Sequence, residues 1–338
     1  MSIPLKKLRH QILVITGATS GIGLTTARMA GRRGARLVLA GRSENALIEL
    51  ERELSKGAHR AVTVTADVGK PADVQRIARI AREKFGGFDT WVNNAGVSMY
   101  GRLLDEPIED MRRLFETNFW GLVYGSLEAA RHLKDRRQTG AIINVGSTLS
   151  DRALALQGIY SASKHAVKGF TDALRMELEM DRIPASVTLI QPGAIATPYS
   201  RHAKNYMKKE PTNPPPVYAP DTVARTILHC AENSERNVYV GAGGKGIPML
   251  GYYAPRLADL LMESLFASQQ QTDRPPARPR SDNGLDRPVG DLQERGDYEG
   301  HVSESSLYTA ASLHPLLTGA ALLGSGLLIR AMWGRSDS

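Results

Sequence analysis

The chain of 338 residues contains a single cysteine, Cys230. One thiol cannot build a disulfide framework, so the class of small proteins held together by several disulfides is excluded. Such sparing use of cysteine is typical of a reducing compartment. We therefore expect a cytoplasmic location.

A secretory signal is also missing from the first ten residues. They contain Lys6, Lys7 and Arg9, but no apolar segment separate from the run ILVI at residues 12–15. A signal peptide needs such a segment, so we do not expect secretion.

The chain lacks a basic patch with interleaved aromatic residues. Lys and Arg number 43 against 35 Asp and Glu, but this excess is spread along the whole sequence. The pattern does not indicate a nucleic-acid partner. A phosphorylated cofactor or an anionic membrane surface would account for a basic balance equally well.

A glycine-rich turn is present directly after the first apolar run, where residues 16–23 read TGATSGIG. Gly17 can supply a tight turn, Gly21 the close approach of a diphosphate, and Gly23 the close packing of a helix on a strand. The free N–H groups at the start of that helix would bind the phosphates. An amphipathic pattern and a second apolar run follow, so this segment predicts a dinucleotide-binding βαβ unit.

No acidic residue stands at the end of the second apolar run before Glu44. An Asp or Glu about 20 residues beyond the glycines would bind the adenosine ribose and select NAD. Arg42 occupies this place instead, and its planar, permanently charged fork suits a 2′-phosphate. We therefore expect NADP(H), with NAD(H) still possible. The alternative is that Arg42 is a solvated charge at the start of the next helix.

Ser147, Tyr160 and Lys164 form a candidate catalytic set. Lys164 lies four residues after Tyr160 in the segment YSASK, and Ser147 lies thirteen positions before the tyrosine, after an apolar run at 141–145. Residues i and i+4 share a helix face, so Lys164 can reach both Tyr160 and a cofactor ribose. Its ammonium group is expected to lower the tyrosine pKa from about 10, and Ser147 to polarise a carbonyl. An isolated Tyr-x3-Lys pair usually faces solvent; the serine at this spacing favours catalysis.

Together with NNAG at residues 93–96, these motifs in this order resemble the short-chain dehydrogenase/reductase family. The resemblance implies that Asn118 completes a catalytic tetrad by ordering a water molecule that links the lysine to solvent. It gives no indication of a metal site. The cofactor contacts that it implies, together with those argued above, are Gly17, Thr19, Ser20, Gly21, Ile22, Gly23, Arg42, Asp67, Val68, Asn94, Ala95, Gly96, Tyr160, Lys164, Pro192, Gly193, Ile195 and Thr197.

Apolar runs alternate with helical patterns seven times between Ile12 and Val240. This rhythm predicts an α/β fold of the Rossmann type, a doubly wound parallel sheet of about seven strands between two layers of helices. We expect residues 1–245 to form this catalytic domain. The helical patterns at 110–136 and 158–181 correspond to the helices through which many members of the family dimerise, so a homodimer or homotetramer is expected.

The remaining residues divide into three segments. Residues 246–268 predict a helical extension, and residues 269–306 have the Pro-, Arg-, Asp-, Ser- and Gly-rich composition of a disordered linker. Residues 307–338 contain an apolar segment that is short for a membrane span. The basic residues that follow it would place the domain on the wrong side of a single span. This segment could cross a membrane, lie at its surface, or pack on a partner.

The sequence thus predicts an NADP(H)-dependent oxidoreductase that interconverts an alcohol and a ketone or aldehyde, with Tyr160 as general acid and base. Leu149, Leu154, Leu156 and Met207 suggest a small hydrophobic alcohol or carbonyl substrate. The alternative is a cofactor-binding regulatory or scaffold protein on the same fold with little turnover. The presence of all four tetrad residues favours the enzyme.

Overall fold

The computed structural model describes residues 3–55, 61–241, 246–290, 292–314 and 318. Its centre is a seven-stranded sheet in the order β11-β7-β6-β4-β1-β2-β3, in which every neighbouring pair is parallel. The strands are β1 (Ile12–Thr16), β2 (Arg36–Gly41), β3 (Ala61–Thr65), β4 (Thr90–Asn93), β6 (Gly140–Val145), β7 (Ala185–Pro192) and β11 (Asn237–Val240).

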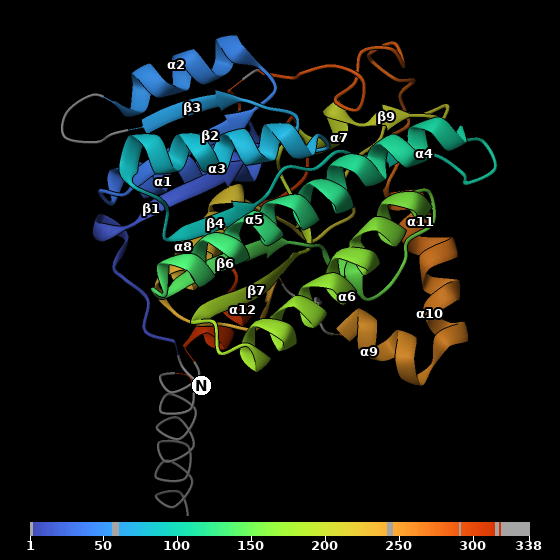
Figure 1. Cartoon of the computed structure of the whole chain (residues 1–338). Helices are drawn as coiled ribbons and strands as arrows, with labels where there is room; N and C mark the ends of the chain where they lie inside the picture. The colour runs from blue at the N-terminus through green and yellow to red at the C-terminus, as the bar shows by residue number, and fades with distance from the viewer. Residues whose placement is uncertain (1–2, 56–60, 242–245, 291, 315–317, 319–338) are drawn as a thin grey trace, which may run out of the picture.

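Helices cover both faces of the sheet (Figure 1). One face packs against α1 (Gly21–Arg32), α2 (Glu44–Leu54) and α8 (Pro220–Glu232). The other packs against α3 (Pro71–Phe85), α5 (Gly121–Arg136) and α6 (Gly158–Met180). The predicted doubly wound α/β fold is confirmed. The central strands are runs of Val, Ile and Leu without polar alternation because both of their faces are buried.

Two apolar cores flank the sheet, and a network of buried polar side chains lies at the centre of the sheet. Asn93, at the end of β4, donates from Nδ2 to Ser126 Oγ at 2.9 Å and to Asn144 Oδ1 at 2.8 Å. These bonds connect β4, α5 and β6. The first asparagine of the NNAG segment therefore stabilises the sheet.

The long helix predicted over 110–136 contains a π-helical turn. It comprises α4 (Ile108–Phe115), the π-turn Glu116–Trp120 and α5. Such turns insert one extra residue, and they are frequent at functional sites. Asn118 lies within this one.

Small elements cluster above the carboxyl ends of the strands. Parallel pairs join β5 (Met99–Tyr100) with β9 (Lys204–Asn205), and β10 (Val217–Tyr218) with β8 (Ala194–Ile195). Between them lies the short helix α7 (Tyr199–His202). The stretch from 199 to 220, which shows no sequence period, is thus built from short pieces of regular structure.

The helical extension consists of α9 (Gly246–Tyr253), α10 (Pro255–Leu261), a π-turn (Met262–Phe266) and α11 (Ala267–Gln269). Met249, Tyr252, Tyr253, Leu257, Leu260 and Leu265 are exposed on it. Among the described residues, no helix is both long enough and apolar enough to cross a bilayer. The apolar segment expected over 307–338 lies mostly outside the described residues; its described part includes α12 (Leu307–Leu313).

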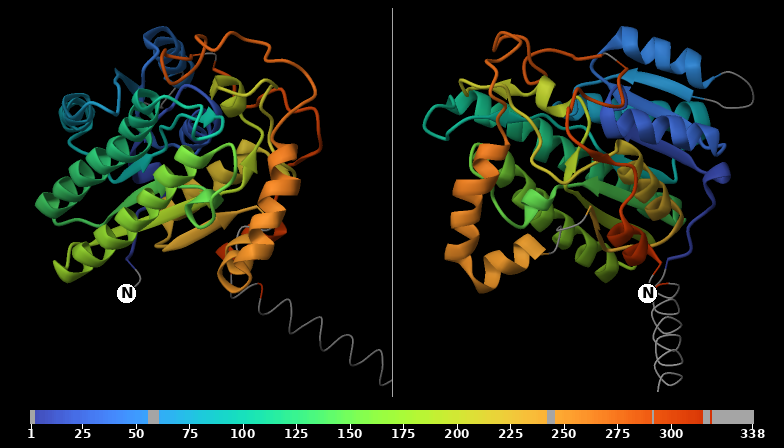
Figure 2. Two further views of the ribbon diagram at one scale, coloured as in Figure 1. Left: turned by 90° about the vertical axis from the view of Figure 1, so that its right-hand side faces the viewer. Right: turned by 180° about the vertical axis from the view of Figure 1, so that it is seen from behind.

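A disordered linker is expected over 269–306, but Gln269 belongs to α11, and residues 270–290 and 292–306 are described as an ordered segment. They follow a defined path across the domain and end in the short strand β12 (Val302–Ser303), which pairs with β10 (Figure 2). The composition is misleading here because the path is fixed chiefly by polar contacts. Examples are the backbone hydrogen bonds from Gly284 N to His202 O at 2.6 Å and from Gly296 N to Ala196 O at 3.1 Å.

Candidate active site

The glycine-rich turn lies between β1 and α1 and has the backbone geometry that its sequence suggests. Gly17 and Gly21 have φ values of +65° and +51°, in the left-handed region that glycine adopts at little cost. A Cβ atom on Gly23 would lie 2.1 Å from the carbonyl oxygen of Gly17. Only glycine therefore allows α1 to start so close to the turn, with its N-terminal end at the cavity described below.

Asn94, in the loop that follows the neighbouring strand β4, holds this turn. Its Nδ2 donates to the carbonyl oxygens of Thr16 at 3.0 Å and Gly17 at 3.2 Å. In return, Thr16 Oγ1 accepts from the backbone N–H groups of Asn94 and Ala95, each at 3.1 Å. The two loops that follow β1 and β4 are thus one rigid unit.

Arg42 follows β2 and is half-buried at the same edge of the sheet. Its Nη2 donates to the carbonyl oxygen of Gly284 and, at 3.2 Å, to that of Arg287. Burial lowers the pKa of its guanidinium group, while the charge of Asp67 acts in the opposite direction. Arg42 is therefore a cation in the wall of the site, tied to the segment that follows residue 270.

Ser147, Tyr160 and Lys164 meet near the end of β6. All three are buried, at 8%, 9% and 5% exposure. Tyr160 and Lys164 lie one turn apart on α6, and Lys164 Nζ is 5.6 Å from the centre of the tyrosine ring. The same Nζ donates to the carbonyl oxygen of Val145 at 2.9 Å. The helix thus presents the hydroxyl and the ammonium group on one face, as predicted.

The expected lowering of the tyrosine pKa is not found. Burial raises the pKa of Tyr160, and hydrogen bonds with Tyr199 and Ser147 lower it by less. The pKa of Lys164 is itself lowered to about 8, also by burial. The prediction considered only the attraction of the ammonium group and neglected the loss of water around both groups, which dominates because both are buried.

Asn118 projects from the π-turn toward the loop that follows β4. Its Oδ1 accepts from Val97 N at 2.8 Å, and its Nδ2 donates to Val97 O at 2.9 Å and to Ser163 Oγ at 3.3 Å. Its side chain is buried and connects this loop to α6, directly before Lys164. A role in ordering water stays a prediction.

A single cavity of about 300 Å³ joins the glycine-rich turn to the catalytic set. Among the predicted residues, Gly23 and Asn118 do not line it, because each packs behind the wall. Those that line it are Gly17, Thr19, Ser20, Gly21, Ile22, Arg42, Asp67, Val68, Asn94, Ala95, Gly96, Ser147, Tyr160, Lys164, Pro192, Gly193, Ile195 and Thr197.

Several lining residues were not predicted. Tyr199 lies two positions beyond Thr197, and its ring centre is 5.6 Å from that of Tyr160 in an edge-on contact. Its place directly after the predicted cofactor contacts Ile195 and Thr197 could have suggested it. Gly284 and Val289 also line the cavity. They come from the supposed linker, and no motif in the sequence marks them.

The comparisons with known proteins agree with this geometry. Residues 11–208 match the family described as short chain dehydrogenase. The chain is 47% identical over 323 residues to "Uncharacterized oxidoreductase YxnA" of Bacillus subtilis, a match that covers 95% of this chain and 90% of the relative. It is 35% identical over 242 residues to "11-beta-hydroxysteroid dehydrogenase A" of Sesamum indicum, covering 68% of this chain and 67% of that one.

A short-chain type dehydrogenase/reductase from Mycobacterium marinum has a similar solved structure, with a TM-score of 0.61 at 25% identity. That likeness covers 74% of this chain and 98% of the other. The chain belongs to the short-chain dehydrogenase/reductase family. As a member, it is an NAD(P)-dependent oxidoreductase.

Proposed function

We propose that the protein is an NADP(H)-dependent reductase or dehydrogenase that interconverts an alcohol and a ketone or aldehyde. One observation supports this most strongly. Arg42, suited to a 2′-phosphate, and the group of Ser147, Tyr160 and Lys164 line the same cavity. A scaffold protein on this fold would not need a buried hydroxyl and a buried ammonium group side by side.

The residues of the cavity fit a phosphorylated dinucleotide. The glycine-rich turn allows a diphosphate to approach the backbone at the N-terminus of α1, where the helix dipole favours negative charge. Arg42 would bind the 2′-phosphate, and Lys164 would donate to the nicotinamide ribose. A phosphate at Arg42 would be favoured over a ribose hydroxyl because the contact is charge-assisted.

When bound, the dinucleotide supplies or accepts the hydride at the carbon of the reacting group. The residues of the chain then have to polarise and protonate the substrate oxygen. Ser147 Oγ would donate a hydrogen bond to the substrate carbonyl oxygen, and Tyr160 would give its phenolic proton to that oxygen as the C–O bond becomes single. In the oxidation direction the same proton returns to the tyrosine. Lys164 would stabilise the phenolate that remains.

The part of the cavity near Tyr160 suggests a mostly apolar substrate with a polar group. Of the four residues that suggested a hydrophobic substrate, Leu149 and Leu154 line the cavity, whereas Leu156 and Met207 are not among its lining residues. Ser98, Gln157 and Tyr199 add polar groups to the wall. The name of the sesame relative, a hydroxysteroid dehydrogenase, supports this class of substrate.

A substrate panel tests the proposal directly. Ketosteroids, retinoids, long-chain aldehydes and quinones would be offered with NADPH or NADH, and the loss of absorbance at the reduced nicotinamide followed. We expect turnover of at least one class, faster with NADPH. Tight binding of NADPH without turnover of any compound would instead favour a regulatory or scaffold protein.

We also propose that the protein forms a homodimer or homotetramer through α5 and α6. Trp120 is 42% exposed and stacks on Tyr124, with ring centres 6.0 Å apart, at the start of α5. Tyr124 is half-buried, and an exposed tryptophan stacked on such a ring on a long helix is typical of an interface. Sedimentation would measure the oligomeric state, and a monomer at micromolar concentration would contradict the proposal.

We further propose that the protein is located in the cytoplasm and associates with a membrane through residues 307–338.

A further inference from the structure

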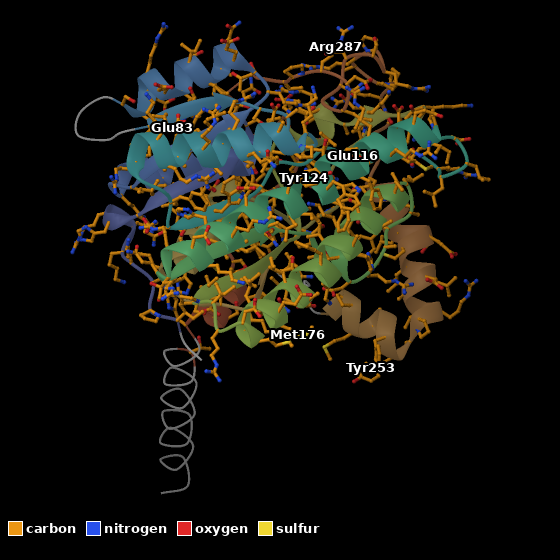
Figure 3. The ribbon with its side chains drawn as sticks, in the orientation of Figure 1. Glu83, Glu116, Tyr124, Met176, Tyr253 and Arg287 are labelled. Carbon is orange, nitrogen blue, oxygen red and sulfur yellow. The ribbon has the colours of Figure 1, made fainter. Side chains whose placement is uncertain are left out.

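Residues 270–290 and 292–306, here called the strap, cross the carboxyl edge of the sheet where the cofactor is proposed to bind. Figure 2 shows the strap leaving α11, passing over the region of α4 and α7 to α2, and returning to α12. Figure 3 labels Arg287 on this path, at the opposite end of the molecule from Met176 and Tyr253. The strap is thus separate from the exposed apolar side of α9.

The first part of the strap forms a wall of the cavity. Gly284 and Val289 line it, and Nη2 of Arg42 donates to the carbonyl oxygens of Gly284 and Arg287. The guanidinium group has other N–H donors that a phosphate could use. One side chain can therefore hold the strap and the cofactor at the same time.

The second part is fixed to α1 next to the glycine-rich turn. Gly21 N donates to Gln293 O at 2.8 Å. The carboxylate of Glu294 accepts from Thr25 Oγ1 at 3.1 Å and from Arg28 Nη1 at 2.8 Å. These contacts place the strap over the N-terminal turn of α1.

The strap is also anchored on the substrate side. Leu285 is 2% exposed and belongs to the apolar cluster that contains Tyr160. Beside it, Asp286 forms ion pairs with Lys204 at 2.9 Å and with Arg113 at 3.0 Å. The strap is therefore held on both sides of the cavity.

We propose that the strap is the outer wall of the dinucleotide site and retains the cofactor, so that exchange requires the strap to open. This inference rests on the proposed NADP(H)-dependent function. The strap lines the cavity with Gly284 and Val289. Its Gln293 carbonyl oxygen accepts from the N–H of Gly21, one of the groups at the N-terminus of α1, whereas Arg42 is oriented by the strap and still has donors for a phosphate. We therefore expect retention of the cofactor rather than competition with it, and the experiment below separates the two.

Two variants would loosen the strap without altering a residue proposed for catalysis or cofactor binding. Glu294→Ala removes the anchor on α1. Its matched control is Glu53→Ala, because Glu53 is the other carboxylate on Arg28, at 2.7 Å, and lies on α2 away from the strap. Gly290→Ala places a Cβ atom 2.5 Å from that of Ser43 and 2.9 Å from that of Ala46, so the strap must move outward.

The measurement is the rate at which bound NADPH leaves the full-length protein after mixing with excess NADP⁺, followed by nucleotide fluorescence. We expect release about tenfold faster in Glu294→Ala, the scale of a lost charge-assisted contact. NADPH release should also be faster in Gly290→Ala, whereas Glu53→Ala should release NADPH at the wild-type rate.

Unchanged release in both strap variants would overturn the inference. So would tighter NADPH binding in those variants, because it would mean that the strap obstructs the site. Failure of the wild type to bind NADPH or NADH would refute the proposed function, and the strap inference with it. Binding of either nucleotide with normal exchange in the variants would refute the strap inference alone.

Discussion

Tyr160 is the residue on which the proposed chemistry depends. A phenol of ordinary pKa, about 10, is already protonated at neutral pH, and burial raises the pKa of Tyr160 further. The hydroxyl group therefore carries a proton for the substrate oxygen, and Lys164 has to stabilise the phenolate that forms. Tyr160→Phe should lower kcat by at least about a hundredfold, the usual contribution of a positioned acid. The NADPH dissociation constant should stay within about twofold of the wild type, because the ring is kept. A Tyr160→Phe variant that keeps most of the wild-type kcat would show that the tyrosine does not transfer the proton.

Lys164 gives the cofactor site a pH dependence. Its charged form predominates below its pKa of about 8 and is lost as the pH rises through that value. NADPH affinity, measured by fluorescence titration between pH 7 and 10, should therefore fall above pH 8. In Lys164→Met the affinity should be weaker and flat over this interval. A wild-type profile with no change between pH 7 and 9 would contradict the role assigned to the ammonium group.

Arg42 is expected to select the cofactor. Arg42→Ala should weaken NADPH binding about tenfold to a hundredfold, as expected when a charge-assisted contact is lost, and NADH binding much less. Dissociation constants for both nucleotides would measure this. Equal losses for both, or a wild-type preference for NADH, would show that Arg42 does not bind the 2′-phosphate.

At the scale of elements, the strand–turn–helix unit was predictable because its glycines have one structural role each. Gly23 illustrates this: a Cβ atom there would meet the Gly17 carbonyl oxygen at 2.1 Å. The Asn118 π-turn could not be predicted in the same way, because its segment has the composition of an ordinary helix. The raised pKa of Tyr160 also could not, since it depends on how completely the folded chain excludes water from the cavity.

Gly23→Ala should therefore lower the free energy of unfolding by about 1–3 kcal/mol, the usual cost of overpacking. Urea unfolding followed by circular dichroism would measure this change. Gly169→Ala is the control, because Gly169 is exposed on α6 and a Cβ atom there meets nothing within 4 Å. That substitution should stabilise the protein by up to about 1 kcal/mol. Similar effects at both positions would mean that α1 can shift away from the turn.

At the scale of the molecule, the parallel sheet followed from the alternation of apolar and amphipathic segments, but the course of the strap did not. Its composition is that of a linker, and few of its side chains are apolar. Order comes from contacts that no local pattern encodes, such as Asp286 with Lys204 and Glu294 with Arg28. Each pair joins residues far apart in the sequence, and only the folded domain brings them together.

This arrangement determines where the chain can be shortened. Thr309 Oγ1 accepts from Gly241 N at 3.0 Å, and Leu313 packs against the main core, so α12 belongs to the domain. Removing residues 314–338 should leave the free energy of unfolding, NADPH binding and turnover of a soluble substrate near those of the full chain. Removing residues from 271 onward should cost stability and speed cofactor release, because it deletes the strap.

Membrane flotation and sedimentation of the full chain and the form ending at Leu313 would separate the two roles of the C-terminal region. We expect the full chain to float with vesicles or to self-associate, because the apolar segment after residue 315 must be buried in lipid or against a partner. The form ending at Leu313 should not float with vesicles, and it should self-associate only through the proposed α5–α6 interface. A full chain that neither floats nor differs in oligomeric state from the shortened form would show that this segment is not an anchor.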